Sequence, residues 1–196
     1  MHPHPLLVLA SSSPYRATLL ERLGLGFTCQ SPDIDEAARP GESADVLVRR
    51  LAEAKARAIA RGHREALVIG SDQVSVLNGQ IIGKPGDHAR AAEQLRAASG
   101  RRLSFLTGLC VLNGATDRAQ VDVVATTVVF RELADAEIDA YLRRERPYDC
   151  AGAFKSEGLG IALLEGIESD DPTALIGLPL IRLCEMLRAE GVEILR

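Results

Sequence analysis

The sequence predicts an α/β protein with a mixed, twisted central sheet flanked by helices. Short apolar stretches of strand character occur among stretches whose apolar residues recur at helical spacing. Hairpin signals interrupt any strict strand-helix-strand alternation, which favours a mixed sheet over a doubly wound parallel one. The 196 residues are enough for one substantial core. We therefore expect a single domain, residues 1–196, whose sheet can split into two lobes around a cleft.

The first elements are a strand and two helices. Residues 6–10 are apolar and lead into Ser11-Ser12-Ser13-Pro14, where serine at the N-cap and proline at the first helical position predict a helix that ends near Gly24. A second helix is capped at Ser43 and runs to about Arg61. One of its faces carries an apolar stripe that contains one lysine: Val48, Leu51, Ala52, Lys55 and Ile59.

The middle of the chain predicts a buried strand followed by a hairpin. Residues 67–71 read as a core strand, and residues 74–77 and 80–82 flank Asn78-Gly79, a strong hairpin signal. Asp72 is therefore expected between a strand and a hairpin. After the turn at Gly83-Lys84-Pro85-Gly86, Asp87 can cap a helix that runs to about Ala98.

The last third predicts strands over 103–112 and 121–131, a helix over 134–145, and a glycine-rich bend with another strand within 151–164. Pro179 begins a final helix. Four of its residues are expected to face inward: Leu180, Leu183, Cys184 and Leu187.

Composition excludes several classes of protein. The net charge of −4 gives no basic field for long nucleic acids. Residues 1–5 lack a basic segment, and no apolar run reaches membrane length, so we expect a cytoplasmic protein with no membrane partner. The cysteines are scattered without metal-ligand spacing, so we expect four reduced and mostly buried thiols: Cys29, Cys110, Cys150 and Cys184.

The serine turn before the first helix has the features of an anion site. Free backbone amides, hydroxyls and the positive end of a helix dipole meet there, and Arg16 adds a cation in the first turn. Plain N-capping is the alternative for any single serine. Three serines followed by an arginine favour phosphate binding.

Two lysines are further candidates for phosphate ligands. Lys55 lies on an apolar helical face, where a boundary lysine reaching for solvent is the alternative. Lys84 stands in a turn fixed by glycine and proline, and could equally be an exposed turn residue.

Acidic residues occur at two places that could serve a metal. Asp72 follows an apolar strand, where a carboxylate commonly binds a metal, orients water or caps a loop. Glu36 belongs to an acidic loop with Asp33 and Asp35, for which a solvated loop is the alternative. Carboxylate oxygens from two loops would suit Mg²⁺ or Mn²⁺ beside a polyphosphate.

These motifs, in this order, resemble the Maf family of nucleoside triphosphate pyrophosphatases over almost the whole chain. The resemblance rests on the following segments: Leu9 to Arg16, Asp35-Glu36, Lys55, Gly70-Ser71-Asp72-Gln73, Gly83-Lys84-Pro85, Ser99-Gly100, Thr107-Gly108, Phe154-Lys155-Ser156-Glu157-Gly158 and Gly177-Leu178-Pro179. It implies a fold like that of the Maf and ITPase proteins, with a nucleotide in the cleft.

The resemblance also implies a reaction and roles. The family, hydrolases acting on acid anhydrides, splits the bond between the α- and β-phosphates of a nucleotide with a divalent cation, Mg²⁺, Mn²⁺ or Co²⁺. By matching motif, Asp72 would be the general base, and Glu36 with Asp72 would bind the metal. Four residues would hold the phosphates: Ser11, Arg16, Lys55 and Lys84.

Departures from the usual pattern bear on the substrate. Members that act on dTTP or UTP typically carry arginine where Tyr15 stands and threonine where Gln73 stands, whereas this chain is similar to the YceF-type subgroup, which prefers 7-methyl-GTP. A methylated purine is cationic, which favours stacking on Tyr15 and pairing with Glu157. Ordinary packing is the alternative for Tyr15.

Two other functions remain open from the sequence. One keeps the reaction and changes the substrate to dTTP or UTP. The other is a non-catalytic nucleotide-binding regulator of cell division, a role also associated with Maf relatives. The resemblance further suggests a homodimer. The sequence does not decide whether Lys155 or Glu168 enters the site.

Overall fold

The computed structural model describes residues 5–195. Residues 1–4, which belong to the N-terminal segment without lysine or arginine, lie outside this range. No helix of residues 5–195 has the length and apolar character to cross a bilayer. The helices and strands follow the chain in this order: β1 (Leu7–Ala10), α1 (Pro14–Glu21), β2 (Phe27–Cys29), α2 (Ala44–Ala60), β3 (Leu67–Leu77), β4 (Gln80–Ile82), α3 (His88–Ala98), β5 (Arg102–Asn113), β6 (Arg118–Phe130), α4 (Asp135–Glu145), β7 (Leu164–Ser169) and α5 (Leu180–Ala189).

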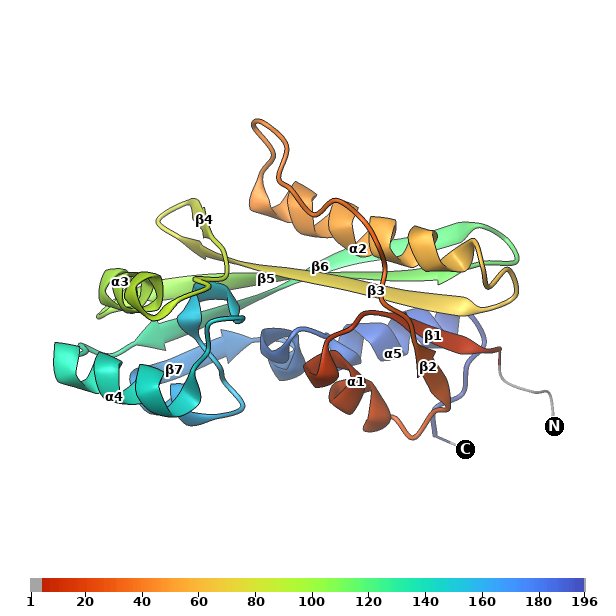
Figure 1. Cartoon of the computed structure of the whole chain (residues 1–196). Coiled ribbons are helices and arrows are strands. Elements are labelled where there is room, and N and C mark those ends of the chain that lie inside the picture. The colour runs from red at the N-terminus through yellow and green to blue at the C-terminus, as the bar shows by residue number, and fades with distance from the viewer. Residues whose placement is uncertain (1–4, 196) are drawn as a thin grey trace. The chain divides into compact units, whose positions relative to one another are not determined.

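The described strands form one mixed sheet of seven strands in the order β2-β1-β3-β5-β6-β7, with β4 paired to β3 (Figure 1). The pairings of β1 with β2 and with β3 are parallel. The pairings of β3 with β4 and of β6 with β7 are antiparallel. This confirms the predicted α/β class with a mixed sheet.

The chain divides into two compact units. The first comprises the residues up to Asp72, Thr107–Val124 and the chain from Asp171 onward, and the second comprises Gln73–Leu106 and Ala125–Asp170. Three strands, β3, β5 and β6, continue from one unit into the other. The single domain and the cleft stay predictions.

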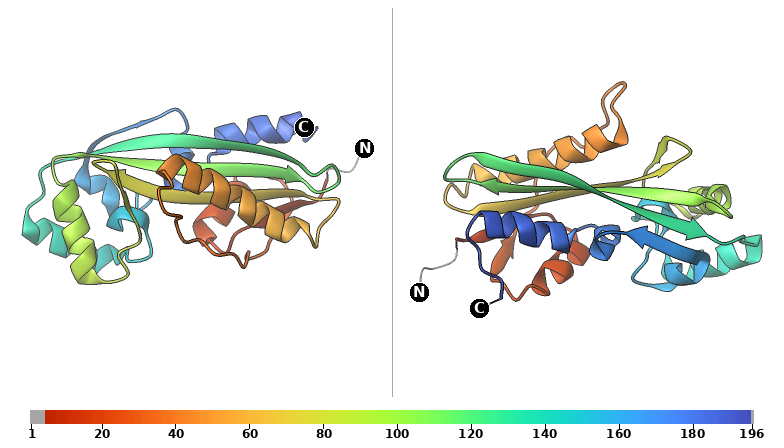
Figure 2. Two further views of the ribbon diagram at one scale, coloured as in Figure 1. Left: turned by 90° about the horizontal axis from the view of Figure 1, so that it is seen from above. Right: turned by 180° about the vertical axis from the view of Figure 1, so that it is seen from behind.

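In the first unit, helices cover both faces of the sheet. The helix α2 lies on one face, and α1 and α5 lie on the other (Figures 1 and 2). Because side chains alternate along a strand, Val8 and Val68 pack with α2, whereas Leu9 and Ile69 pack with α1 and α5. Strands β1, β3 and β5 therefore contribute to both cores.

Two glycines allow α2 to lie unusually close to the sheet. A Cβ at Gly70 would stand 2.1 Å from the carbonyl oxygen of Ala52, and one at Gly108 would stand 2.2 Å from that of Val48. These neighbours are helix backbone, which cannot move aside as a side chain can. The contact also requires a small residue on the helix, and Ala56 lies beside Gly70.

The predicted helix starts are confirmed. The side chain of Ser13 accepts from the backbone of Arg16, with Pro14 at the first position of α1. Ser43 caps α2, and Asp87 caps α3 in the same way.

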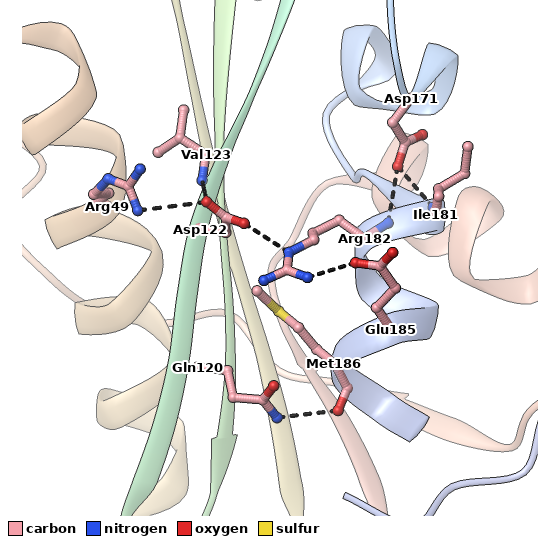
Figure 3. A network of polar contacts seen from close by, with 9 residues as sticks. All are labelled: Arg49, Gln120, Asp122, Val123, Asp171, Ile181, Arg182, Glu185 and Met186. Atoms are coloured by element: carbon pink, nitrogen blue, oxygen red, sulfur yellow. Dashed lines mark hydrogen bonds and ion pairs between the residues drawn. The ribbon is translucent and has the colours of Figure 1, made fainter. Parts of the chain in front are cut away.

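One acidic side chain joins α2 and α5 at the edge of the sheet. Asp122 of β6 accepts from the Nε of Arg182 at 2.7 Å and lies 3.7 Å from Nη1 of Arg49 (Figure 3). Beside it, the side-chain amide of Gln120 donates to the carbonyl of Met186 at 3.1 Å. These contacts tie both helices to the same strand.

The second unit has a small core of aromatic rings. The ring centroid of Phe154 lies 5.9 Å from that of Phe105 and 5.5 Å from that of Phe130. Helices α3 and α4 contact each other in this unit. The rings connect the segment after α4 with strands β5 and β6.

Four of the predictions were wrong. Asp72 does not end a strand, because β3 runs without a break from Leu67 to Leu77. Two 3₁₀ helices occupy Ala151–Ala153 and Leu159–Leu163, so the strand predicted within 151–164 begins only at Leu164. Only Cys110 is buried, and Cys184 on α5 is half-buried while Met186 faces the core.

The close contact of α2 with the sheet can be tested by adding a methyl group. The variant Gly70→Ala should unfold at a lower temperature, with a loss of about 3 kcal/mol or more, because the methyl group would overlap helix backbone. Thermal unfolding checks this. The control is Gly62→Ala, where the nearest atom to the added Cβ is 3.8 Å away. Equal stability of the two variants would contradict the close contact.

Candidate functional site

A buried ion pair joins α2 to β3. The Nζ of Lys55 lies 2.6 Å from Oδ1 of Asp72 and 2.8 Å from Oε1 of Glu36. Lys55 is 5% exposed and Asp72 is 6% exposed, whereas the Glu36 side chain is 56% exposed. Lys55 is therefore not a boundary lysine that reaches solvent, and the three residues form one cluster.

The strand alternation explains why this pair can form. Gly70 faces α2, so Asp72, two residues later, faces α2 as well. Lys55 lies one residue before Ala56, which contacts Gly70. The close approach of helix and sheet thus brings the ammonium to the carboxylate.

The serine turn brings Ser11 and Arg16 together. Ser11 is buried directly after β1, and its Oγ accepts from the backbone of Ser13 at 3.1 Å and from Nη1 of Arg16 at 3.5 Å. The cap of α1 is Ser13, so capping does not account for Ser11. The Nε of Arg16 donates to the carbonyl of Gly177 at 2.8 Å.

The electrostatics of Arg16 connect it to the ion pair. Burial lowers the pKa of the Arg16 guanidinium, while the charges of Asp72 and Glu36 act in the opposite direction. An arginine still remains charged at neutral pH. For Arg16 the cost of burying the charge is larger than the stabilisation by the nearby carboxylates. An anionic ligand would therefore stabilise the charged guanidinium.

The cluster fits a divalent cation. The charges of Asp72 and Glu36 act on Arg16, and both carboxylates contact Lys55, so these two cations and two carboxylates together carry no surplus charge for a polyphosphate. Both carboxylates converge on one ammonium. Mg²⁺ is commonly held by one or two carboxylates together with substrate phosphates. Residues 5–195 contain no cluster of three or more metal-ligating side chains.

A clamp that the sequence did not predict holds the loop that carries Glu36. Arg50 donates to both oxygens of Glu42, at 2.6 Å and 2.7 Å, and to the carbonyl of Ala37 at 3.0 Å. The hydrogen bonds from Arg50 and from the backbone of Arg39 lower the pKa of Glu42 to about 2. The spacing of Glu42 and Arg50 carries no recognisable signal, because their contact depends on the path of the loop.

The remaining predicted site residues are distributed as follows. Tyr15 lies half-buried in the first turn of α1, in the first unit. The second unit holds Gln73, half-buried on β3, and the exposed residues Lys84 and Glu157. The roles of these four residues stay predictions.

The two residues that the sequence left undecided have partners in the second unit. The Nζ of Lys155 lies 2.9 Å from Oε1 of Glu145, and Oε2 of the same carboxylate accepts from the backbone N–H of Leu159 at 2.7 Å. Arg102 donates to both carboxylate oxygens of Glu168. Glu145 thus fixes the turn that carries Glu157.

The clamp predicts a specific pH dependence of stability. The folded-state pKa of Glu42 lies below its ordinary value, so its pairing with Arg50 stabilises the protein above about pH 4.5 and is lost as the pH falls toward 2. The variant Glu42→Gln should therefore have a lower melting temperature than the native chain at pH 6, and this difference should shrink steadily down to pH 3. Thermal unfolding across this range measures it.

The matched control is Glu53→Gln, which removes the half-buried i,i+4 partner of Arg57 on α2. It should change the melting temperature little, since an i,i+4 ion pair on a helix contributes about 0.3–0.5 kcal/mol. If the difference in melting temperature between Glu42→Gln and the native chain does not change with pH, the clamp does not stabilise the fold through the charge of Glu42.

The chain is similar to known proteins over nearly its whole length. Residues 6–190 match the family model described as Maf-like protein. The 7-methyl-GTP pyrophosphatase of Pseudomonas fluorescens is 60% identical over 188 residues, covering 96% of this chain and 98% of that protein. The protein of the same name from Nitrosococcus oceani is 57% identical over 191 residues, covering 97% and 96%.

A solved structure, that of the Staphylococcus aureus Ham1 protein, aligns with a TM-score of 0.47 at 19% identity and covers 66% of this chain and 72% of that chain. The family model and the curated relatives each span nearly the whole chain, from the serine turn to the final helix. The chain therefore belongs to the Maf-like protein family.

Proposed function

We propose that this chain hydrolyses the bond between the α- and β-phosphates of 7-methyl-GTP and releases 7-methyl-GMP and pyrophosphate. The names of its relatives, 7-methyl-GTP pyrophosphatases, support the choice of 7-methyl-GTP as the substrate. The observation that carries the proposal is the buried pair of Lys55 and Asp72, 2.6 Å apart, beside the serine turn. Family membership supports the reaction class.

In this proposal Asp72 is the general base. Lys55 donates to Oδ1 of Asp72 and offsets the cost of burying the carboxylate. The carboxylate would accept a proton from the attacking water, a step that typically contributes about 10²- to 10⁴-fold to the rate. The rigid strand on either side holds the group in place.

The phosphates would be held by four residues, Ser11, Arg16, Lys55 and Lys84, which stabilise the charge that develops as the bond breaks. Glu36 and Asp72 would hold a divalent cation, Mg²⁺, Mn²⁺ or Co²⁺. When bound, the cation supplies positive charge to the phosphate oxygens. That charge is needed because the carboxylates of the cluster already balance its two cations.

Recognition of the base is assigned to three residues. Tyr15 would stack on the methylated purine, whose positive charge favours an aromatic ring. Glu157 would accept hydrogen bonds from the guanine edge, and Gln73 would select among polar groups. The protein would act in the cytoplasm as a homodimer, and its ligand would be a small nucleotide.

Pyrophosphate release, measured on a panel of nucleotides, tests the proposal. The chain should show its highest kcat/KM with 7-methyl-GTP, compared with GTP, dTTP and UTP, and should require Mg²⁺, Mn²⁺ or Co²⁺. The variant Asp72→Asn should lose at least about 100-fold in kcat while remaining folded. The control Asp122→Asn removes a carboxylate that contacts Arg182 elsewhere on the sheet, and should keep its activity.

Each other outcome has a definite meaning. A preference for UTP or dTTP would replace the proposed substrate and reject the roles of Tyr15, Gln73 and Glu157. Stoichiometric nucleotide binding without turnover would support the non-catalytic regulator. Full activity of Asp72→Asn would remove Asp72 as the base.

A further inference from the structure

The carbonyl oxygen of Gly177 accepts hydrogen bonds from two other elements. The Nε of Arg16, on α1, donates to it at 2.8 Å. The Oγ of Ser71, on β3, lies 2.9 Å from the same oxygen. Gly177 follows the 3₁₀ helix Pro172–Ile176, just before α5. Three segments far apart in the sequence therefore meet at one carbonyl.

These contacts fix the orientation of the Arg16 guanidinium. The Nε is bound to Gly177, and Nη1 lies 3.5 Å from Oγ of Ser11. Within residues 5–195, Nη2 of Arg16 has no hydrogen-bond acceptor. Because the guanidinium is planar, fixing two of its nitrogens determines where the third one points.

The carbonyl itself needs an anchor. Gly177 has φ +115°, a conformation that side-chain-bearing residues rarely adopt, and glycine at this position leaves the orientation of its carbonyl free to vary. Ser71 is fully buried, and its Oγ also lies 2.8 Å from the carbonyl of Gly108. Its single hydroxyl proton is shared between these two carbonyl oxygens, so it holds the Gly177 carbonyl against the rigid centre of the sheet.

The rest of this segment is held without Ser71. Asp171 is 3% exposed and accepts from the backbone of Ile181 at 2.7 Å and of Arg182 at 3.2 Å (Figure 3). The hydroxyl of Thr107 donates to the carbonyl of Ala174 at 2.9 Å. Removing the Ser71 hydroxyl should therefore free the Gly177 carbonyl without unfolding the segment.

We propose that Ser71 is a positioning residue for Arg16 and acts through the carbonyl of Gly177, so that Nη2 of Arg16 is directed at a phosphate group. This extends the proposed function and rests on its assignment of Arg16 to phosphate binding. Ser71 and Asp72 are neighbours whose side chains point to opposite faces of the sheet. Strand β3 would thus orient Arg16 through Ser71 and supply the general base with the next residue, Asp72.

A double-mutant cycle on the full chain tests the proposal, with inorganic pyrophosphate in the presence of Mg²⁺ as the probe. Calorimetry gives the Kd for the native chain, Ser71→Ala, Arg16→Lys and the double variant. We expect Ser71→Ala to raise Kd about tenfold in the native chain, the effect of one misplaced charge-assisted hydrogen bond. In the Arg16→Lys background, which lacks the planar fork, the same change should raise Kd less than about twofold.

Thr107→Val is the matched control, because it removes a buried hydroxyl that holds the same segment at Ala174. It should lower the melting temperature comparably to Ser71→Ala and leave Kd within about twofold of the native value. A general loosening of the segment would instead affect both variants alike. The melting temperatures of all variants show that each is folded.

Three results would overturn the inference: an unchanged Kd for Ser71→Ala, an equal effect of Ser71→Ala in both backgrounds, or no binding of pyrophosphate by the native chain. The proposed function fails separately. If the cycle gives the expected coupling but no nucleotide is hydrolysed, the positioning role of Ser71 stands and the assigned reaction does not.

Discussion

The buried ion pair of Lys55 and Asp72 is the interaction on which the arrangement of the first unit depends. An ammonium and a carboxylate that are each about 95% shielded are tolerated only with excellent geometry, and here they lie 2.6 Å apart. That geometry exists because Gly70 admits the backbone of α2 against the sheet. The close packing of α2 on the sheet thus also places the ammonium of Lys55 beside the carboxylate of Asp72.

The same strand serves a second polar group on its other face. Pairing of β1 with β3 ends at Gly70, so the residues that follow lie beyond the end of β1. Asp72 points toward α2 and Ser71 toward Gly177 and Arg16. The charge of Asp72 still influences the pKa of Arg16, so the groups on the two faces are electrostatically coupled.

Much of this could be predicted from the sequence, because the signals are local. Serine at Ser13 and Ser43 marked helix starts, and the apolar stripe of α2 placed Lys55 on the helix face that packs on the sheet. The stripe left open whether the ammonium group reaches solvent. The pattern around Asp72 suggested a strand end because Gly70 and two polar residues interrupt the apolar run. The strand continues there because its other edge is covered by β5.

The remaining features depend on contacts between distant residues. The Arg50 and Glu42 clamp is set by the path of a loop, and the bond from Ser71 to Gly177 joins residues 106 positions apart. Neither produces a periodicity or a spacing that a single sequence reveals. The glycine at Gly177 was part of the resemblance, but only the structure shows that its carbonyl receives Arg16.

The most direct test of this account is the coupling energy between Lys55 and Asp72. Chemical denaturation of the native chain, Lys55→Met, Asp72→Asn and the double variant gives the four free energies of unfolding. The account predicts that Lys55→Met alone costs about 3 kcal/mol, because it leaves Asp72 buried without its cation, and that the double variant recovers at least about 2 kcal/mol of this loss. Additive effects of the two substitutions would contradict it.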